Sequence, residues 1–399
     1  MTEQTIETTL SRWAANSKAA TDQFDRMVED VKGGWQKYEQ VLRHISEQVI
    51  DDQLDFPADL SVSADNYADN GKQLELSYMK RGKSVKISRH AMQQLCGIAE
   101  FPLAYSNKLV SECAGMPERT RLDLLEGCLN THLQRGMYRS RSKDSQLLSR
   151  VVQGTLRGLL SNRYNLLLPT VPLLAAFMET SRAMGAFLYD ATMNDTRVVV
   201  RVVLPHILSP VPGEHVVFGL GFANSDFGAG KLKVTSFLLR PHSRSILVGA
   251  DSLSKVHLGK LVEESDIQLS KETQLKGIQA SQSVVRDAVR DLWSTSRVEA
   301  AMAGVVEATE KNLPWATIAK RLNGVFTKEE LEAAKRMATG ETTLPELPRL
   351  EFAEDKKTLL TTAWWTASYV GHLASQQEDA GRREELQELA GSFLTGMAA

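Results

Sequence analysis

The sequence predicts an α+β protein with an antiparallel β-meander core, flanking helices, a helical N-terminal arm and a helical C-terminal region. Four runs rich in Val, Leu and Phe lie between residues 197 and 249, and the loops between them are too short for crossover helices. Apolar residues recur at three- and four-residue steps in residues 5–50 and 270–298, which is the helical period. The 399-residue chain is 42% hydrophobic and 24% charged, a composition typical of a packed globular protein.

Three regions are expected: an acidic helical arm over residues 1–55, an α+β core with an antiparallel sheet over 56–269, and a helical C-terminal region over 270–399. In the arm, Gly33 and Gly34 are expected to interrupt the helix. Residues 72–87 alternate apolar and polar side chains around Arg81-Gly82, which predicts a hairpin.

Ser88 then occupies the position of an N-cap, and Gly97 and Pro102 mark the turn between two helices that run to Leu109. This helix pair is interpreted as a packing unit, with a DNA-reading helix-turn-helix as the alternative. Further along the chain we expect strand or turn from residue 151 and a second Ser-capped helix at Ser270. The remaining predictions are a helix at 172–188, strands at 197–205, 215–224, 231–240 and 245–249, and a final amphipathic segment at 357–393.

Positive charge is concentrated in the interior of the chain. Residues 132–163 hold seven Lys/Arg and one Asp (7 − 1 = +6), and residues 231–260 hold six and one (6 − 1 = +5). Residues 1–55 hold six Lys/Arg and eleven Asp/Glu (6 − 11 = −5), and residues 328–399 hold eight and thirteen (8 − 13 = −5). The net charge of −2 therefore hides a basic middle between acidic ends.

No pattern in the sequence predicts a catalytic residue, a metal site or a cofactor. Gly219-Leu-Gly221-Phe-Ala-Asn224 resembles a dinucleotide-binding turn, but the next element reads as a strand, where that turn requires a helix N-terminus. Gly228-Ala-Gly230-Lys231 lacks the P-loop pattern, because Ser225 stands where its first Gly belongs and Leu232 where its magnesium-binding hydroxyl belongs. The eight histidines show no metal-ligand spacing.

The basic middle predicts a non-enzymatic nucleic-acid-binding protein, with single-stranded DNA as the first choice of partner. Cations that follow a phosphate backbone, with aromatic rings for base stacking, are what single-strand binding needs. Exposed amides of the Gly-rich loop are a further candidate for phosphate contact. The candidate binding residues are Arg135, Arg139, Arg141, Lys143, Arg163, Tyr164, Asn224, Ser225, Lys231, Lys233, Arg240 and Arg244.

Several segments resemble an uncharacterised family of phage- and plasmid-borne proteins, the phage/plasmid-like family (domain of unknown function 932). The matching pieces are KISRHAMQQLCGIAEFPLAYSNKL, RGLLSNRYNLL, GLGFANSDFGAGKLKVTSFLLR, SKVHLGKL and AWWTASYVGHLAS, in family order over roughly residues 70–395. The resemblance implies a mobile-element context and an α+β core, but no activity. Where members of the family carry a Cys-Thr-Asn-Gly turn, this chain has Pro241-His-Ser-Arg244.

A meander followed by a long helix is also similar to the core of single-strand annealing proteins, so recombination or replication is the expected setting. Two alternatives stay open. One is a protein-interaction module that uses the acidic ends and Trp364-Trp365. The other is a metal-dependent nuclease built on Asp226 with Asp190, Asp195 or Asp251.

Three cysteines without paired spacing (Cys96, Cys113 and Cys128) are typical of reduced thiols in a cytosol. The N-terminus lacks the basic start and apolar run of a signal peptide, and no run approaches 18 apolar residues. We therefore expect a cytoplasmic protein without membrane association, and a homo-oligomer.

Overall fold

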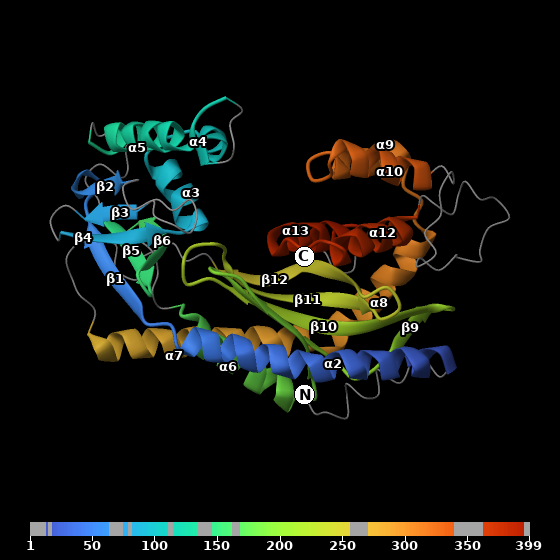
Figure 1. Cartoon of the computed structure of the whole chain (residues 1–399). Coiled ribbons are helices and arrows are strands. Elements are labelled where there is room, and N and C mark those ends of the chain that lie inside the picture. Colours follow the sequence, from blue (N-terminus) through green and yellow to red (C-terminus); the bar gives the residue numbers. More distant parts are fainter. Residues whose placement is uncertain are drawn as a thin grey trace.

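The computed structural model describes residues 13–14, 18–63, 75–78, 82–110, 115–134, 146–161, 168–255, 270–338 and 362–394. The architecture is α+β, as predicted, and it contains two mixed helix–sheet lobes (Figure 1). We call the lobe built on strands β1–β6 and helices α3–α5 the small lobe. The rest of the described chain, built on strands β7–β12, is the large lobe. Among the described residues no helix is long and apolar enough to cross a membrane.

The small lobe packs three helices on a six-stranded sheet in the order β1-β5-β6-β4-β3-β2. All its pairs are antiparallel except β4 with β6. Leu95, Leu125 and Leu129 from the helices are completely buried in its core. The elements are β1 (Ile50–Asp55), the 3₁₀ helix η1 (Pro57–Asp59), β2 (Leu60–Ser63), β3 (Glu75–Tyr78), β4 (Lys83–Ile87), α3 (Arg89–Ile98), α4 (Leu103–Val110), α5 (Glu118–Gln134), β5 (Leu147–Val152) and β6 (Thr155–Ser161).

The large lobe is built on an antiparallel sheet in the order β12-β11-β10-β8-β7, with β9 also paired to β10. The strands are β7 (Phe187–Met193), β8 (Val198–Val203), β9 (Leu208–Val211), β10 (Glu214–Asn224), β11 (Leu232–Arg240) and β12 (Ser245–Lys255). Helices α6 and α7 lie on one side of β10–β12, and α12 and α13 lie on the other (Figure 1). The helices are α2 (Lys18–Ser46), α6 (Thr170–Ala183), α7 (Lys271–Leu292), α8 (Thr295–Glu310), α9 (Trp315–Leu322), α10 (Lys328–Ala338), α12 (Ala363–Ser375) and α13 (Ala380–Gly391).

The period of two along each strand gives this sheet two different faces. We call the face that carries the even-numbered residues of β8, β10 and β11 the even face, and the opposite one the odd face. On the even face, the Phe222 ring lies 5.5 Å from the Phe177 ring of α6, and the Phe218 ring lies 5.7 Å from the Trp293 ring at the end of α7. Its other members include Val198, Val200, Val202, Leu220 and Val234, all in the main hydrophobic cluster. The odd face carries an apolar strip and three cations, described below.

Helices cover strands at both ends of this sheet, and glycines allow the close approach. A Cβ on Gly34 of α2 would lie 2.7 Å from the carbonyl oxygen of Tyr189 in β7. A Cβ on Gly391 of α13 would collide with the backbone of Val248 in β12. Such coverage protects the backbone of an edge strand. The predicted helix break at Gly33-Gly34 is therefore wrong, because these glycines lie inside α2 and Gly34 serves packing.

Most predicted elements are confirmed, including the hairpin β3–β4 and the four strands of the meander. Ser88 and Ser270 are N-caps, because their hydroxyls accept from the amides of Ala91 and Thr273 at 3.2 Å. The prediction missed β1, which lies in the expected helical arm, as well as β2, β7 and β9, and it ran the helix at 172–188 too far. That helix ends at Ala183 because Gly185, with φ of +78°, leaves the helical region. The predicted core also contains two sheets, since β1–β6 form one of their own.

Candidate functional site

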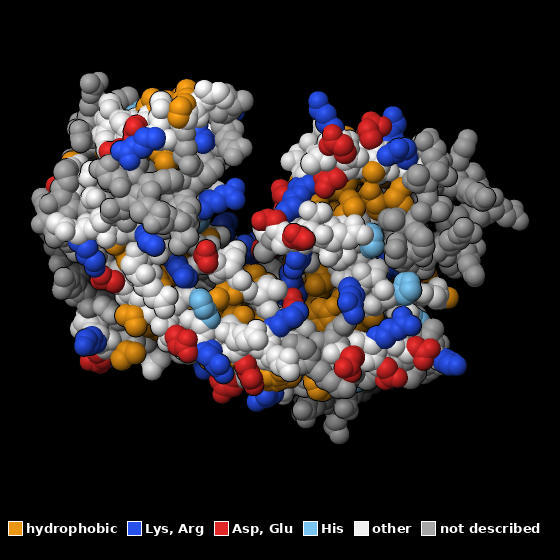
Figure 2. Space-filling model, in the orientation of Figure 1, with side chains coloured by type: hydrophobic (Ala, Val, Ile, Leu, Met, Phe, Trp, Pro, Cys, Tyr) orange, Lys and Arg blue, Asp and Glu red, His pale blue; other side chains and the backbone are white. Residues whose placement is uncertain are grey.

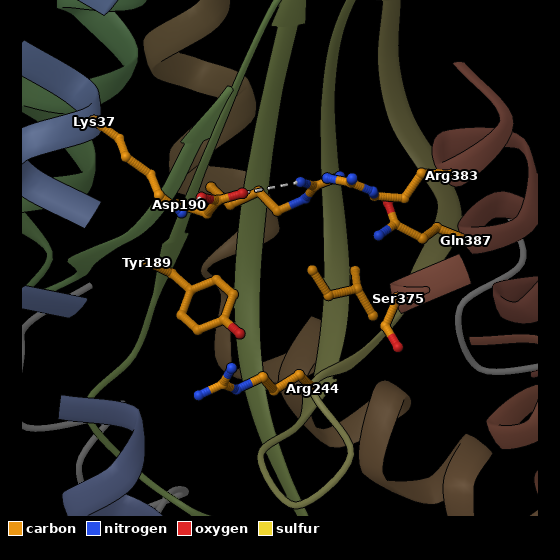
Figure 3. A pocket seen from close by; sticks show the side chains of 9 residues that line it. Lys37, Tyr189, Asp190, Arg244, Ser375, Arg383 and Gln387 are labelled. Atoms are coloured by element: carbon orange, nitrogen blue, oxygen red, sulfur yellow. Dashed lines mark hydrogen bonds and ion pairs between the residues drawn. The ribbon is translucent and has the colours of Figure 1, made fainter. Parts of the chain in front are cut away.

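A recess of about 300 Å³ lies over the odd face of the large-lobe sheet, between α2 and α13 (Figure 3). We call it the basic recess. Among the described residues, four cationic side chains and one carboxylate line it, and their formal charges sum to 4 − 1 = +3. Its lining residues are Lys37, Tyr189, Asp190, Arg201, Arg244, Ile246, Ser375, Arg383 and Gln387.

Arg201 forms the floor of the basic recess and comes from the centre of β8. It is 7% exposed. It pairs across the sheet with Gly221 of β10. Its Nη2 donates to Oε1 of Gln387 at 2.7 Å, and its Nη1 lies 3.7 Å from the Asp190 carboxylate. Burial lowers the pKa of Arg201, while the carboxylates of Asp190 and Glu384 act in the opposite direction.

Asp190 bridges two cations at one side of the recess. Its carboxylate accepts from Nζ of Lys37 at 3.1 Å as well as facing Arg201. The Lys37 side chain is 59% exposed, so this cation is open to solvent. Figure 3 shows the Tyr189 ring between Asp190 and Arg244, at the edge of the recess. The site therefore offers an aromatic face beside its cations.

Arg244 lines the recess from the turn between β11 and β12, and its backbone is strained. Its φ is +53°, in the left-handed region that costs a side-chain-bearing residue about 1 kcal/mol or more. The side chain is exposed. From α13, the Arg383 guanidinium donates to the carbonyl of Gln377 at 2.9 and 2.6 Å, which fixes it at the recess wall. A strained residue at a recess marks a candidate for function.

Two other cations of the odd face are neutralised by α13. Arg197 binds Glu384 at 2.6 Å, and Lys233 binds Glu388. Gln387 completes the same helical surface, because residues three and four apart lie on one side of a helix. Lys233 was a predicted phosphate contact, but its charge is compensated internally.

Arg240 is also internal. It forms an ion pair with Glu214 at 2.8 Å, and both side chains are only 4% exposed. Its guanidinium lies 5.4 Å from the centre of the Trp364 ring. A buried pair of this kind is kept together by the cost of leaving either charge alone. Arg240 is thus placed in the protein interior, away from any phosphate backbone outside.

Asn224 and Ser225, predicted to present the Gly-rich loop to phosphates, are buried instead. The Asn224 amide donates to the carbonyl of Leu168 at 2.9 Å and contacts the Thr170 hydroxyl. The Ser225 hydroxyl donates to the carbonyl of Thr196 at 2.6 Å and accepts from two loop amides. Their polar groups hold the loop in shape. The interpretation of GLGFAN as a strand is confirmed, because residues 219–224 are the last residues of β10. The next element is the strand β11, as expected.

The loop after Asn224 joins the two lobes through its main chain. Arg150 of β5 donates to the carbonyl of Asp226, and both Nε2 of Gln94 and the ring of His90 contact the carbonyl of Phe227, at 3.0 and 3.1 Å. A Cβ on Gly158 of β6 would lie 3.1 Å from the same Phe227 oxygen. The loop therefore anchors the small lobe to the end of the large-lobe sheet.

The carboxylates of the proposed nuclease are engaged separately. The Asp226 carboxylate accepts from the amide of Thr170 at the start of α6, while Asp190 pairs with Lys37 and Arg201. Asp226 and Asp195 line one cavity, but its volume of about 10 Å³ suits a single water molecule. Within the described part of the chain, no three His, Cys, Asp or Glu side chains are grouped to hold a metal ion. The side chain of Asp251 lies outside the described residues.

Half of the predicted binding residues cannot be placed. Arg135, Arg139, Arg141, Lys143, Arg163 and Tyr164 lie outside the described residues. Of the others, Lys231 is exposed at the end of the Gly-rich loop and Arg244 lines the basic recess. Sequence reasoning missed Lys37, Tyr189, Arg201 and Arg383. A signal for Arg201 was present, because it is a charge within the apolar run RVVVRVVLP.

At the scale of the whole surface, Figure 2 shows a notch between the small lobe and the C-terminal helices, with Lys and Arg side chains on its walls.

Comparison with known protein families, with curated proteins and with solved structures finds no match. The resemblance to the phage/plasmid-like family thus stays an expectation from the sequence.

Proposed function

We propose that this protein is a non-enzymatic nucleic-acid-binding protein that takes single strands, and that the basic recess is a point of phosphate contact. The observation that carries the proposal is the convergence of Lys37, Arg201, Arg244 and Arg383 around one recess, in which Asp190 is the one carboxylate among the described lining residues. Arginine guanidinium groups bind phosphate oxygens through paired, charge-assisted hydrogen bonds. Tyr189 supplies an adjacent ring of the kind on which unpaired bases stack.

The structure narrows the set of residues behind the proposal. Arg240 is buried in its ion pair with Glu214 and Lys233 is partly buried against Glu388, whereas Lys37, Lys231 and Arg244 are exposed. The mobile-element context, and a role in recombination or replication, rest on the sequence resemblance alone.

The test is a fluorescence-anisotropy titration of a labelled single-stranded oligonucleotide into the full-length chain. With about four cations contacting phosphates, affinity should fall on the order of 50-fold between about 50 and 200 mM salt. Arg244→Gly should weaken binding about tenfold, the order expected for one charge-assisted contact. Arg290→Ala is the matched control, because Arg290 is an exposed arginine on α7, which covers the opposite face (side chain 60% exposed).

The same variant separates function from stability. Because Gly adopts positive φ without steric cost, Arg244→Gly should raise the free energy of unfolding by up to about 1 kcal/mol. Urea unfolding monitored by circular dichroism measures this change. Weaker binding together with higher stability indicates that Arg244 is kept for the ligand. Unchanged binding at both salt concentrations contradicts a role for the recess.

A protein-interaction module is the second candidate, favoured by exposed apolar side chains on the helices of the small lobe. Leu103, Tyr105 and Leu124 on α4 and α5 are 37%, 44% and 38% exposed. Trp364, which the sequence suggested for this role, is buried against Arg240. The oligonucleotide titration discriminates between the two candidates, since an interaction module of this kind binds no oligonucleotide even at low salt.

A further inference from the structure

Phe187, at the start of β7, is an aromatic residue that packing leaves half open to solvent. It is 48% exposed, more than any other aromatic residue in the described part of the chain, whereas Phe218 and Phe222 on the even face are buried. Phe187 pairs with Val203, which belongs to the buried apolar cluster of the odd face. Because paired residues point to the same side of a sheet, the Phe187 ring lies on the face that carries the basic recess.

A bulge in β7 brings a second ring, that of Tyr189, to the same side. The pairing register shifts between Leu188 and Asp190, which leaves Tyr189 as an extra residue in the ladder. A bulge of this kind re-aims a side chain. The Tyr189 ring packs against the apolar cluster of the odd face and lines the basic recess (Figure 3). Because residues two apart on a strand lie about 7 Å apart, Phe187 and Tyr189 follow one another along β7.

The spacing of the two rings suits unpaired bases. In a duplex, successive bases of one strand are stacked about 3.4 Å apart, and each covers the face of its neighbour. Two side chains about 7 Å apart match bases that have separated from each other, as in an extended single strand. Stacking on an aromatic side chain strengthens binding by about fivefold to a hundredfold per base, and it tolerates any sequence because every base has a π-face.

Cations beside the rings complement the phosphates of such a strand. Asp190, which follows Tyr189 in β7, accepts from Lys37 and faces Arg201. Aromatic rings flanked by cations are the arrangement that single-strand binding uses. Nucleobases that carry their own phosphates therefore match this surface better than an uncharged apolar partner does.

We propose that β7 is a stacking platform on which Tyr189 and Phe187 bind two successive unpaired bases of a nucleic-acid strand. The inference rests on the proposed function, and it names what the site selects, which is the bases of a single strand irrespective of their sequence. The cations of the basic recess hold the adjoining phosphates. Bases inside a duplex are excluded from the platform because they present no open face.

The experiment compares a labelled single-stranded oligonucleotide with an abasic strand of the same length, which keeps every phosphate and lacks the bases. Fluorescence anisotropy with the full-length chain measures both affinities at one fixed salt concentration. The strand with bases should bind about 25-fold or more tightly, at about fivefold or more for each ring. In competition, a duplex of equal length should displace the labelled strand less well than the unlabelled single strand does.

Variants assign the preference for bases to the platform. Phe187→Leu keeps an apolar side chain but removes the ring, so the preference over the abasic strand should fall by about fivefold or more. Phe187→Trp keeps a ring and should retain the preference. Leu275→Ala is the control and should also retain it, because Leu275 is 59% exposed on α7, which covers the opposite face. Circular dichroism verifies that each variant is folded, as expected for substitutions at exposed positions.

The outcomes separate the two proposals. Equal, salt-dependent binding of the normal and abasic strands overturns the stacking platform and supports the proposed function through phosphate contact alone. A preference for bases that Phe187→Leu leaves unchanged also overturns the platform. No binding of either strand overturns both proposals, and self-association that Phe187→Leu abolishes would then place the ring in a contact between two copies of the chain.

Discussion

The two faces of the large-lobe sheet are built from alternate residues of the same strands, and they differ in composition. The even face is apolar and packs its aromatic rings against α6 and the end of α7. The odd face combines buried apolar residues such as Phe237 with Arg197, Arg201 and Lys233. The odd face has charged side chains at positions where the even face has apolar ones, and Arg201 lines its recess. The even face is thus purely a packing surface, whereas the odd face combines packing with charged groups.

The largest change in the free energy of unfolding is expected for a substitution on the even face. Phe222→Ala should lower the free energy of unfolding by about 4 kcal/mol, because Phe222 is completely buried and its loss leaves a cavity beside Phe177. Thr235→Ala, on the odd face beside Gly221, should cost less than about 1 kcal/mol. Urea denaturation measures both. Comparable losses for the two variants would contradict the close packing of Phe222 against Phe177.

Breaking the buried ion pair between Arg240 and Glu214 should give the next largest change in the free energy of unfolding. Glu214→Gln should lower the free energy of unfolding by about 3 kcal/mol, because it leaves the Arg240 charge buried against Trp364 without a counter-charge. Glu272→Gln in the exposed pair with Lys276 is the control and should change stability by less than about 0.5 kcal/mol. A small loss in Glu214→Gln would show that Arg240 has access to another anion or to solvent.

The smallest expected change is a pH dependence of stability, and it concerns Asp226 in the loop that joins the two lobes. Burial raises the pKa of Asp226, while Arg150 acts against this. The folded state then holds the proton more tightly than the unfolded state, so stability decreases as pH rises from about 4 through the raised pKa. Asp226→Asn keeps an oxygen that accepts from the Thr170 amide but carries no charge. Its stability relative to the natural protein should therefore rise with pH across that window, as thermal unfolding at several pH values would show. A difference that is independent of pH would contradict the raised pKa.

The sequence predicted the meander well because each of its strands is a local run with clear boundaries, and β10 and β11 follow that pattern almost residue for residue. Ser88 and Ser270 were recognisable for the same reason, since a cap acts within three residues. The recess was not predictable in this way. It brings Lys37 together with Arg383, two residues from opposite ends of the chain, and no local period encodes their meeting.

Charge in the sequence was also an incomplete guide to charge at the surface. Lys233 and Arg240 belong to the most basic windows, yet their partners Glu388 and Glu214 cancel them in the fold. The acidic C-terminal region proved to be a source of counter-charge for the sheet through Glu384 and Glu388. Only the arrangement in space shows that Lys233 and Arg240 pair with these carboxylates.

The joint between the lobes has an evolutionary consequence. It is made by the carbonyl oxygens of Asp226 and Phe227, and every amino acid provides such an oxygen. Selection on the joint acts instead on the donors Gln94 and Arg150, and on Gly158, which must remain small. Descendants of this protein should therefore preserve residues 94, 150 and 158 together, and residue 227 should stay a large apolar residue because Phe227 is buried beside Arg150.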